Sequence, residues 1–210
     1  MLCAIAAAVA VVPPAADAAC GGVAHGWPAR VRGPGPPPLA IGDSVMLGAV
    51  GQLTGAGLEV NTRGCRPMSE GLEVIASRRR SHSLPDVVVL ALGANSTVSS
   101  SQVRSALRML GRHRVLGLVT MPEANGAPSS DHAVIRAAGR RWHARVKVLD
   151  WVAYSSGKGW TWDGMHLKPE GATAFARLLR RSLTWPTPGS TMTLEGGDAP
   201  VPRDGLRPVP

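Results

Sequence analysis

The sequence is poor in aromatic residues, and this bounds the kind of core it can build. Its 210 residues include six Trp but only one Tyr and one Phe, so aromatic residues make up 4% of the chain. Hydrophobic residues make up 44%. The core must therefore consist mainly of Val, Leu, Ile and Ala, the usual stock of a parallel sheet buried under helices. The length suits one domain of ordinary size.

Cysteine is scarce as well, and no metal-binding spacing is present. The six histidines are scattered without a C-x-x-C or H-x-x-x-H pattern. We therefore expect neither a metal ion nor another cofactor. Of the three cysteines, Cys3 lies in the apolar segment at the amino terminus. Cys20 and Cys65 form a disulfide if the protein is exported, or else remain two free thiols.

Basic residues outnumber acidic ones, yet the sequence contains no nucleic-acid-binding motif. The net charge is +9, from 23 Lys and Arg against 14 Asp and Glu. Nearly all of this excess falls between residues 38 and 184. Basic surfaces attract polyanions, although Arg-rich outer helix faces are also compatible with plain solvation. Basic residues do not alternate with aromatic ones. We expect a monomer that binds no nucleic acid, with a cell-envelope polyanion as a candidate partner.

The amino terminus lacks an apolar run long enough to cross a bilayer. Leu2 to Val12 is an apolar stretch of 11 residues, which is too short for a transmembrane helix. Pro13-Pro14 and the cleavage pattern Ala16-Asp17-Ala18 follow. We interpret residues 1–18 as a signal peptide and expect a secreted or cell-surface protein, although no Lys or Arg precedes the apolar run. Lipid attachment at Cys20 is an alternative that Asp17 fits poorly.

Proline and glycine divide the rest of the chain. Gly33 to Pro38 reads as a linker, so we assign residues 19–37 to a connecting segment and 38–184 to one domain. Residues 185–210 are rich in Pro and Gly and lack hydrophobic periodicity, which predicts a disordered tail.

Strand and helix patterns alternate within 38–184. Short apolar or β-branched runs predict five strands, at 39–41, 58–61, 86–92, 114–121 and 146–151. A capping box at Ser99 and Gln102 starts a helix that Gly111 ends. Two further helices are expected at 133–142 and from Pro169 onward. The alternation predicts an α/β three-layer sandwich around a mostly parallel five-stranded sheet, with flavodoxin-like strand order.

Polar residues follow several of these strands, at the sheet edge where α/β folds bind ligands. Ser44, in Gly-Asp-Ser-Val, comes between the first strand and a helix. A serine there is a candidate nucleophile or an ordinary helix cap. Asn95 follows the third strand and offers an amide to an oxyanion, or it is a turn residue. Gly64 offers a backbone N–H in the same way, or it is a simple loop glycine.

A base for Ser44 is found near the end of the domain. Asp163 and His166 lie three residues apart in Asp-Gly-Met-His, just before the last helix. Serine activation needs a histidine base and an acid that orients it. One loop supplies both.

These four blocks, in this order, resemble the SGNH hydrolase superfamily, also called GDSL-like. The stretches GDSVMLG and DGMHLKPEG are especially similar to SGNH domains attached to membrane acyltransferases that modify bacterial cell-wall glycans. The resemblance covers residues 38–184. It implies the three-layer fold, Ser44 as nucleophile, His166 as base and Asp163 as its partner. Ser44 N–H, Gly64 N–H and the Asn95 amide are implied as oxyanion donors.

Two positions depart from the family pattern. Val45 replaces the Leu of the GDSL form, and Ser96 replaces an acidic residue that often follows the third block. The resemblance implies an exported serine esterase that acts on an acyl ester, with acetyl as the expected group, of a cell-envelope glycan or small molecule. An O-acetyltransferase that passes the acyl group to a glycan hydroxyl is an alternative, and a non-catalytic glycan-binding module is another.

The export hypothesis is testable on the protein itself. We expect the mature chain to begin near Ala19 and to be found outside the cytoplasm, because signal peptidase cleaves after small-residue motifs such as Ala16-Asp17-Ala18. Amino-terminal sequencing of the secreted or membrane fraction checks this. Recovery of an intact Met1 there would reject cleavage.

Overall fold

A single six-stranded sheet forms the centre of the fold. The computed structural model describes residues 20–31, 35–123 and 131–188. The sheet order is β1-β3-β2-β4-β5-β6. In chain order the strands are β1 (Val23–Gly26), β2 (Leu39–Gly42), β3 (Glu59–Arg63), β4 (Val87–Ala91), β5 (Val115–Val119) and β6 (Val146–Leu149).

Strands β2 to β6 are parallel and are the five predicted from sequence, each within two residues of its expected ends. Their spatial order is the flavodoxin-like one, so the predicted fold class is confirmed. The expected signal peptide, 1–18, lies outside the described residues.

The sixth strand, β1, corrects the expectation of a linker over residues 19–37. It pairs antiparallel with β3, Val23 facing Arg63. A disulfide joins Cys20 to Cys65 and so fixes this edge. The sequence could not reveal the strand, because its four residues alternate between exposed and half-buried positions and none of them lies in the core. Pairing and the cross-link, rather than burial, hold it in place.

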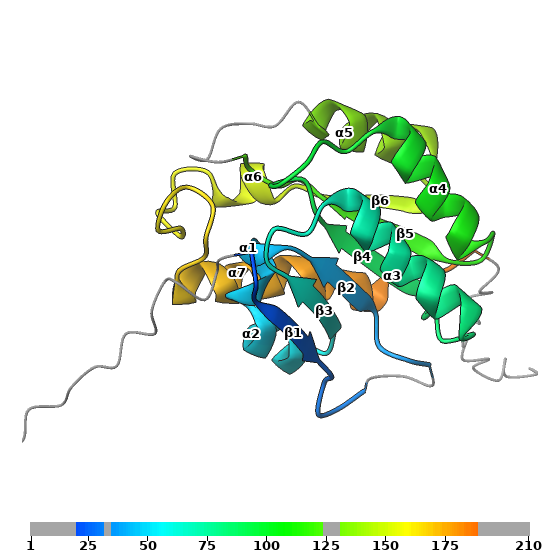
Figure 1. Ribbon diagram of the computed structural model, residues 1–210, viewed down its shortest axis with the longest axis horizontal. Coiled ribbons are helices and arrows are strands. Elements are labelled where there is room, and N and C mark those ends of the chain that lie inside the picture. Colours follow the sequence, from blue (N-terminus) through cyan, green and yellow to red (C-terminus); the bar gives the residue numbers. More distant parts are fainter. Residues whose placement is uncertain (1–19, 32–34, 124–130, 189–210) are drawn as a thin grey trace, which may run out of the picture.

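Helices cover both faces of the sheet (Figure 1). One face carries α3 (Met68–Arg80), α4 (Ser100–Leu110) and α5 (Asp131–Arg141), packed on one buried cluster. The other face carries α1 (Ser44–Leu47), α2 (Val50–Gly55), α6 (Trp151–Ser155) and α7 (Pro169–Leu179), followed by the 3-10 helix η3 (Arg180–Thr184). Successive strand residues alternate between the two clusters: Leu39 and Ile41 face one, Ala40 the other.

The predicted helices are found, and one further long helix was not anticipated. Ser99 and Gln102 form the expected capping box of α4. The helix missed by the sequence reasoning is α3, whose side chains are largely polar and basic. Only Met68, Gly71 and Ile75 are buried along it, so the apolar repeat is too sparse to indicate a helix.

The domain continues past its expected end at residue 184. Trp185 packs against the core, with two carbons of its ring 3.0 Å from where a Cβ on Gly117 would stand. Residues 189–210 of the expected tail lie outside the described part of the chain. Among the described helices, none combines the length and apolarity needed to span a membrane.

Candidate active site

Ser44 is fixed at the carboxyl end of β2 by contacts around the preceding residue. Asp43 is the N-cap of α1, and its Oδ1 accepts a hydrogen bond from the Val45 N–H at 3.1 Å. The hydroxyl of Thr62, at the end of neighbouring β3, donates to the Asp43 carbonyl at 2.7 Å. Gly42 is required at the turn, because an added Cβ would lie 2.7 Å from the Cβ of Met46. The nucleophile candidate therefore has a rigid support.

The second half of the site is a short hairpin before α7. Thr161 and Leu167 form an antiparallel bridge. Inside it, the Trp162 N–H donates to the His166 carbonyl at 2.8 Å. Gly164 takes a positive φ of 86° in the turn. This tight ribbon presents His166 toward Ser44 from a segment far away in the sequence.

Asp163 organises the hairpin turn as well as the histidine. Its Oδ1 accepts from the backbone N–H groups of Met165 and His166, at 3.0 and 2.7 Å. Its Oδ2 lies 2.6 Å from Nδ1 of His166. Partial burial raises the pKa of Asp163, but these hydrogen bonds and the imidazole charge outweigh it and lower the pKa to about 2. Asp163 is thus ionised at any physiological pH.

The structure brings Ser44, His166 and Asp163 into one hydrogen-bonded chain. An ionised carboxylate only accepts, so Nδ1 of His166 carries the proton that it donates to Asp163. Nε2 is then free to accept from the Ser44 hydroxyl, 3.2 Å away. This is the arrangement in which a histidine withdraws a proton from a serine.

The three expected oxyanion donors differ in whether they are free to bind an oxyanion. The first N–H groups of a helix have no intrahelical partner, so the Ser44 N–H at the start of α1 is available. Asn95 is exposed, and its side chain lies close enough to Asp43 to lower the pKa of that carboxyl. Gly64 does not meet the expectation, since its N–H already donates to the Gly22 carbonyl at 2.7 Å. The β1–β3 pairing and the disulfide place Gly22 there.

Comparisons with known proteins agree with this architecture. No protein-family model matches the chain. The candidate peptidoglycan O-acetyltransferase YrhL of Bacillus subtilis (strain 168) is 29% identical over 150 residues, which are 69% of this chain and 23% of that protein. The chain thus spans less than a quarter of that relative.

Two solved structures share the fold. The C-terminal catalytic domain of peptidoglycan O-acetyltransferase A from Streptococcus pneumoniae, solved with a methylsulfonyl adduct, matches with a TM-score of 0.61 and 22% identity, covering 70% of this chain and 92% of that one. An acetyl xylan esterase from Geobacillus stearothermophilus matches with a TM-score of 0.55 and 15% identity, covering 71% and 94%. The chain has the SGNH hydrolase fold.

The candidate site also rests on buried residues that the sequence reasoning missed. Arg66 is 5% exposed, and its Nη1 donates to the carbonyls of Gly42 and Asn61, at 3.2 and 2.7 Å. It thereby ties β3 to the residue two before Ser44. The position of Arg66 just after β3 could have indicated that it lies near Ser44, because the carboxyl ends of adjacent parallel strands meet at one edge of the sheet.

Asp43 is the other unexpected feature of the candidate site. The residue is fully buried, and its Oδ2 has no hydrogen-bond partner within the described part of the chain. Burial raises the pKa of Asp43 to about 6, against the opposing pull of the Val45 and Ala94 N–H groups, the Asn95 amide and the His166 charge. A carboxyl that resists ionisation therefore directly precedes Ser44.

Among the described residues, no group of three or more His, Cys, Asp or Glu side chains is placed to hold a metal ion.

The raised pKa of the buried Asp43 carboxyl leads to a prediction about stability. The pKa of Asp43 lies at about 6 in the folded protein, above its ordinary 3.8, so the folded state keeps a proton that the unfolded state has released between these values. Stability from this group is present at low pH and is lost as pH rises through 6. We expect Asp43→Asn, which still caps α1, to remove this loss. Relative to the wild type, the free energy of unfolding of this variant should increase by about 2 kcal/mol between pH 4 and pH 7.

Urea unfolding of both proteins at several pH values measures the difference. Asp86→Asn, at an exposed position, is the matched control and should leave the pH dependence as in the wild type. Parallel stability curves for wild type and Asp43→Asn would contradict a raised pKa at Asp43.

Proposed function

We propose that this chain catalyses acyl transfer through Ser44, as an esterase that removes an acyl group, most simply acetyl, from a cell-envelope glycan. The observation that carries the proposal is the continuous chain from Asp163 Oδ2 to His166 at 2.6 Å and from His166 Nε2 to the Ser44 hydroxyl at 3.2 Å. A non-catalytic glycan-binding module has no need for this alignment.

The reaction takes two steps. Ser44 Oγ attacks the ester carbonyl while Nε2 of His166 takes its proton, and ionised Asp163 stabilises the imidazolium. The Ser44 N–H and the Asn95 amide stabilise the oxyanion. Collapse of this intermediate breaks the ester bond, and His166 returns the proton to the leaving alcohol. In the second step His166 deprotonates an acceptor hydroxyl, which attacks the acyl-serine and regenerates Ser44.

The choice of an acetylated envelope glycan rests on the relatives. Their names assign them to O-acetyl transfer on peptidoglycan and to de-acetylation of xylan. These activities support an acetyl ester on a polysaccharide as substrate and a location at the cell envelope for this chain. Export by the segment 1–18 fits such a location.

An O-acetyltransferase is the second candidate. It uses the same acyl-serine and differs only in the second step, where a sugar hydroxyl replaces water. The names of two relatives favour it.

Trp162 supports a carbohydrate substrate. Residues facing each other across an antiparallel pair have their side chains on the same side, and Trp162 faces His166 in the hairpin. Its side chain thus lies on the face that carries the catalytic imidazole, yet it is 68% exposed. Lys168 Nζ lies 5.4 Å from the ring centroid and steadies it. An exposed, fixed aromatic ring beside the reacting centre suits the apolar face of a sugar.

The nucleophile assignment predicts the effect of Ser44→Ala. The variant should lose about 10⁴-fold or more in kcat/KM for p-nitrophenyl acetate, because no other described group can form the acyl-enzyme. It should also lose labelling by a fluorophosphonate probe. Ser77→Ala, an exposed serine on α3, is the control and should be labelled like the wild type.

Turnover of Ser44→Ala at the wild-type rate would refute the proposal. Adding a glycan oligosaccharide to the wild-type reaction separates the two candidates. An esterase releases acetate, whereas a transferase forms acetylated oligosaccharide at the expense of acetate.

The role of Trp162 predicts a substrate-dependent effect. Trp162→Ala should raise KM for an acetylated oligosaccharide about three- to tenfold, since a stacked ring contributes on the order of 1 kcal/mol. It should leave kcat/KM for p-nitrophenyl acetate within about twofold of wild type, because the backbone bond to His166 remains. Trp27→Ala, 56% exposed on the wild-type surface, should change neither value. Equal losses on both substrates would mean that Trp162 supports the hairpin rather than the sugar.

A further inference from the structure

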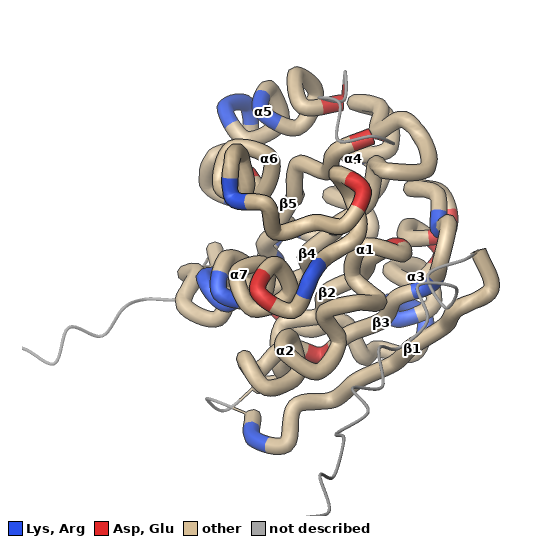
Figure 2. The backbone as a smooth tube through the Cα atoms, turned by 90° about the vertical axis from the view of Figure 1, so that its left-hand side faces the viewer, with Lys and Arg blue, Asp and Glu red and all other residues tan. Residues whose placement is uncertain are grey.

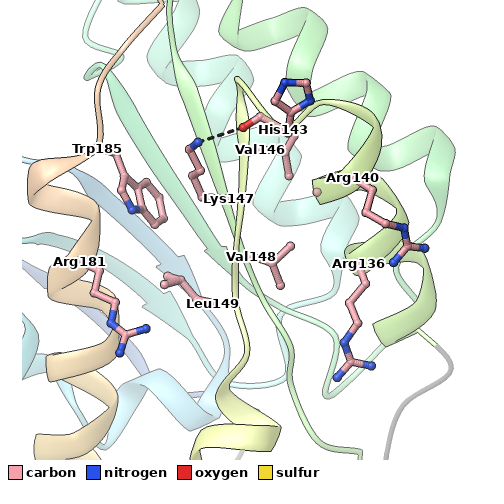
Figure 3. Close-up of a pocket in the computed structure, with 10 residues that line it drawn as sticks. Arg136, Arg140, His143, Val146, Lys147, Val148, Leu149, Arg181 and Trp185 are labelled. Carbon is pink, nitrogen blue, oxygen red and sulfur yellow. Dashed lines mark hydrogen bonds between the residues drawn. The ribbon is translucent and has the colours of Figure 1, made fainter.

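A hollow of the described surface lies away from Ser44, along the outer strand β6. It has a volume of about 640 Å³ and is bounded by α5, β6 and η3 with Trp185 (Figure 3). Arg136 and Arg140 project from α5 on one side of β6, and Lys147 and Arg181 lie on the other. Figure 2 shows the same concentration of Lys and Arg on α5 and beside α7. No carboxylate lines the hollow.

A second hollow, of about 390 Å³, is lined in part by residues that neighbour those of the first in the sequence. It lies between the end of α4 and the turn after α5, and it too is lined by four cationic side chains and by no acid: Arg104, Arg108, Arg112 and Arg145. The chain between α5 and β6 joins the two. Trp142 and Arg145 line the second hollow, whereas His143 and Lys147 line the first. We call these eight Lys and Arg side chains the basic band.

The charge of the band is almost unopposed. Arg136 pairs with Asp150 at 2.8 Å, and the other seven have no ion pair among the described residues. Three of them are held by uncharged groups, and one of these is Arg108, whose Nη2 donates to the Ser105 hydroxyl at 2.8 Å. Lys147 Nζ donates to the His143 carbonyl at 2.9 Å, and Arg145 donates to the carbonyls of Leu107 and Gly111. These bonds orient the side chains but leave their positive charge to attract an anion.

The band is separate from the catalytic site. Its second hollow lies where the chain leaves α4 and α5 to enter β5 and β6, at the amino ends of these strands. Ser44 follows the carboxyl end of β2, at the opposite edge of the sheet. A ligand on the band would therefore hold the protein without occupying the reaction centre.

The arrangement and charge of the basic band indicate which class of ligand it can bind. Two hollows linked by one segment of the chain, each with four cations, match the repeated charges of a linear polymer better than one small anion. A peptide strand added to β6 fits poorly, since the Val146 N–H already donates to the Trp142 carbonyl at 2.7 Å. Nucleobases need open ring faces for stacking. Arg141 lies over the Trp142 ring, 5.3 Å from its centroid, and the Trp185 ring packs on the Gly117 backbone.

We propose that the basic band binds an anionic glycan chain, whose carboxylates or phosphates pair with the guanidinium groups. Such a site would anchor the protein on an acidic envelope polymer while Ser44 acts on acyl esters nearby.

The test uses fluorescently labelled polygalacturonate oligomers and the full-length mature protein, with binding followed by fluorescence anisotropy. The double variant Arg140→Glu with Arg181→Glu reverses one charge on each side of β6. It should weaken binding at least about tenfold at low salt, and added salt should weaken wild-type binding because it screens surface charge. The variant Arg108→Glu with Arg112→Glu should act similarly through the second hollow.

The control is Arg30→Glu with Lys158→Glu, which changes the net charge equally at exposed positions outside both hollows. It should keep wild-type affinity within about threefold. Circular dichroism and p-nitrophenyl acetate turnover show whether each variant is folded. If Arg140→Glu with Arg181→Glu is not folded, Arg140→Gln with Arg181→Gln takes its place. Because binding is measured directly, the result stands whether or not Ser44 proves catalytic.

Three results would overturn the proposal: equal losses in the band and control variants, equal binding of neutral dextran, or tighter binding of single-stranded DNA than of polygalacturonate. The last would assign the band to nucleic acid.

Discussion

The hydrogen bond between His166 and Ser44 is the contact on which the rest of this structure depends for its chemistry. The two residues are 122 positions apart, so the whole domain between them must fold before the imidazole reaches the hydroxyl. Each partner is held by a rigid local unit. Ser44 starts a helix that Asp43 caps, and His166 ends a hairpin turn that Asp163 closes. The sheet sets the distance between the two units.

The surroundings of this bond shift the pKa values of two aspartates in opposite directions. Asp163 accepts two backbone N–H bonds and the imidazole, so its pKa falls to about 2. Asp43 is buried one residue before the nucleophile, and its pKa rises to about 6. One carboxylate thus remains charged throughout the physiological range and can stabilise an imidazolium, whereas the other takes up a proton as the pH falls through about 6. Arg66 is buried as well, and its guanidinium binds backbone carbonyls instead of a carboxylate. The strongest fixed negative charge therefore faces the imidazole.

The carboxyl edge of the sheet and its two outer strands, β1 and β6, serve different purposes. Functional side chains follow the carboxyl ends of β2 and β4, as in other open α/β sheets. The outer strand β1 adds none of them, but its pairing with β3 takes up the Gly64 N–H that the family pattern reserves for the oxyanion. The disulfide between Cys20 and Cys65 fixes that pairing. At the far edge, β6 lies in the basic band. One domain thus combines a compact reaction centre with a charged surface that is independent of it.

Local patterns in the sequence predicted the five parallel strands, the capped helix α4 and the individual residues of the triad. The strand order was predicted from the right-handedness of crossover connections. Strand β1, helix α3, Arg66 and the state of Gly64 were decided only in the tertiary structure. The tetrapeptide Gly-Leu-Glu-Val shows why. Its first copy, 57–60, enters β3, and its second, 71–74, lies within α3. Identical residues adopt both conformations because the partners that satisfy their backbone and bury their apolar side chains are distant in sequence.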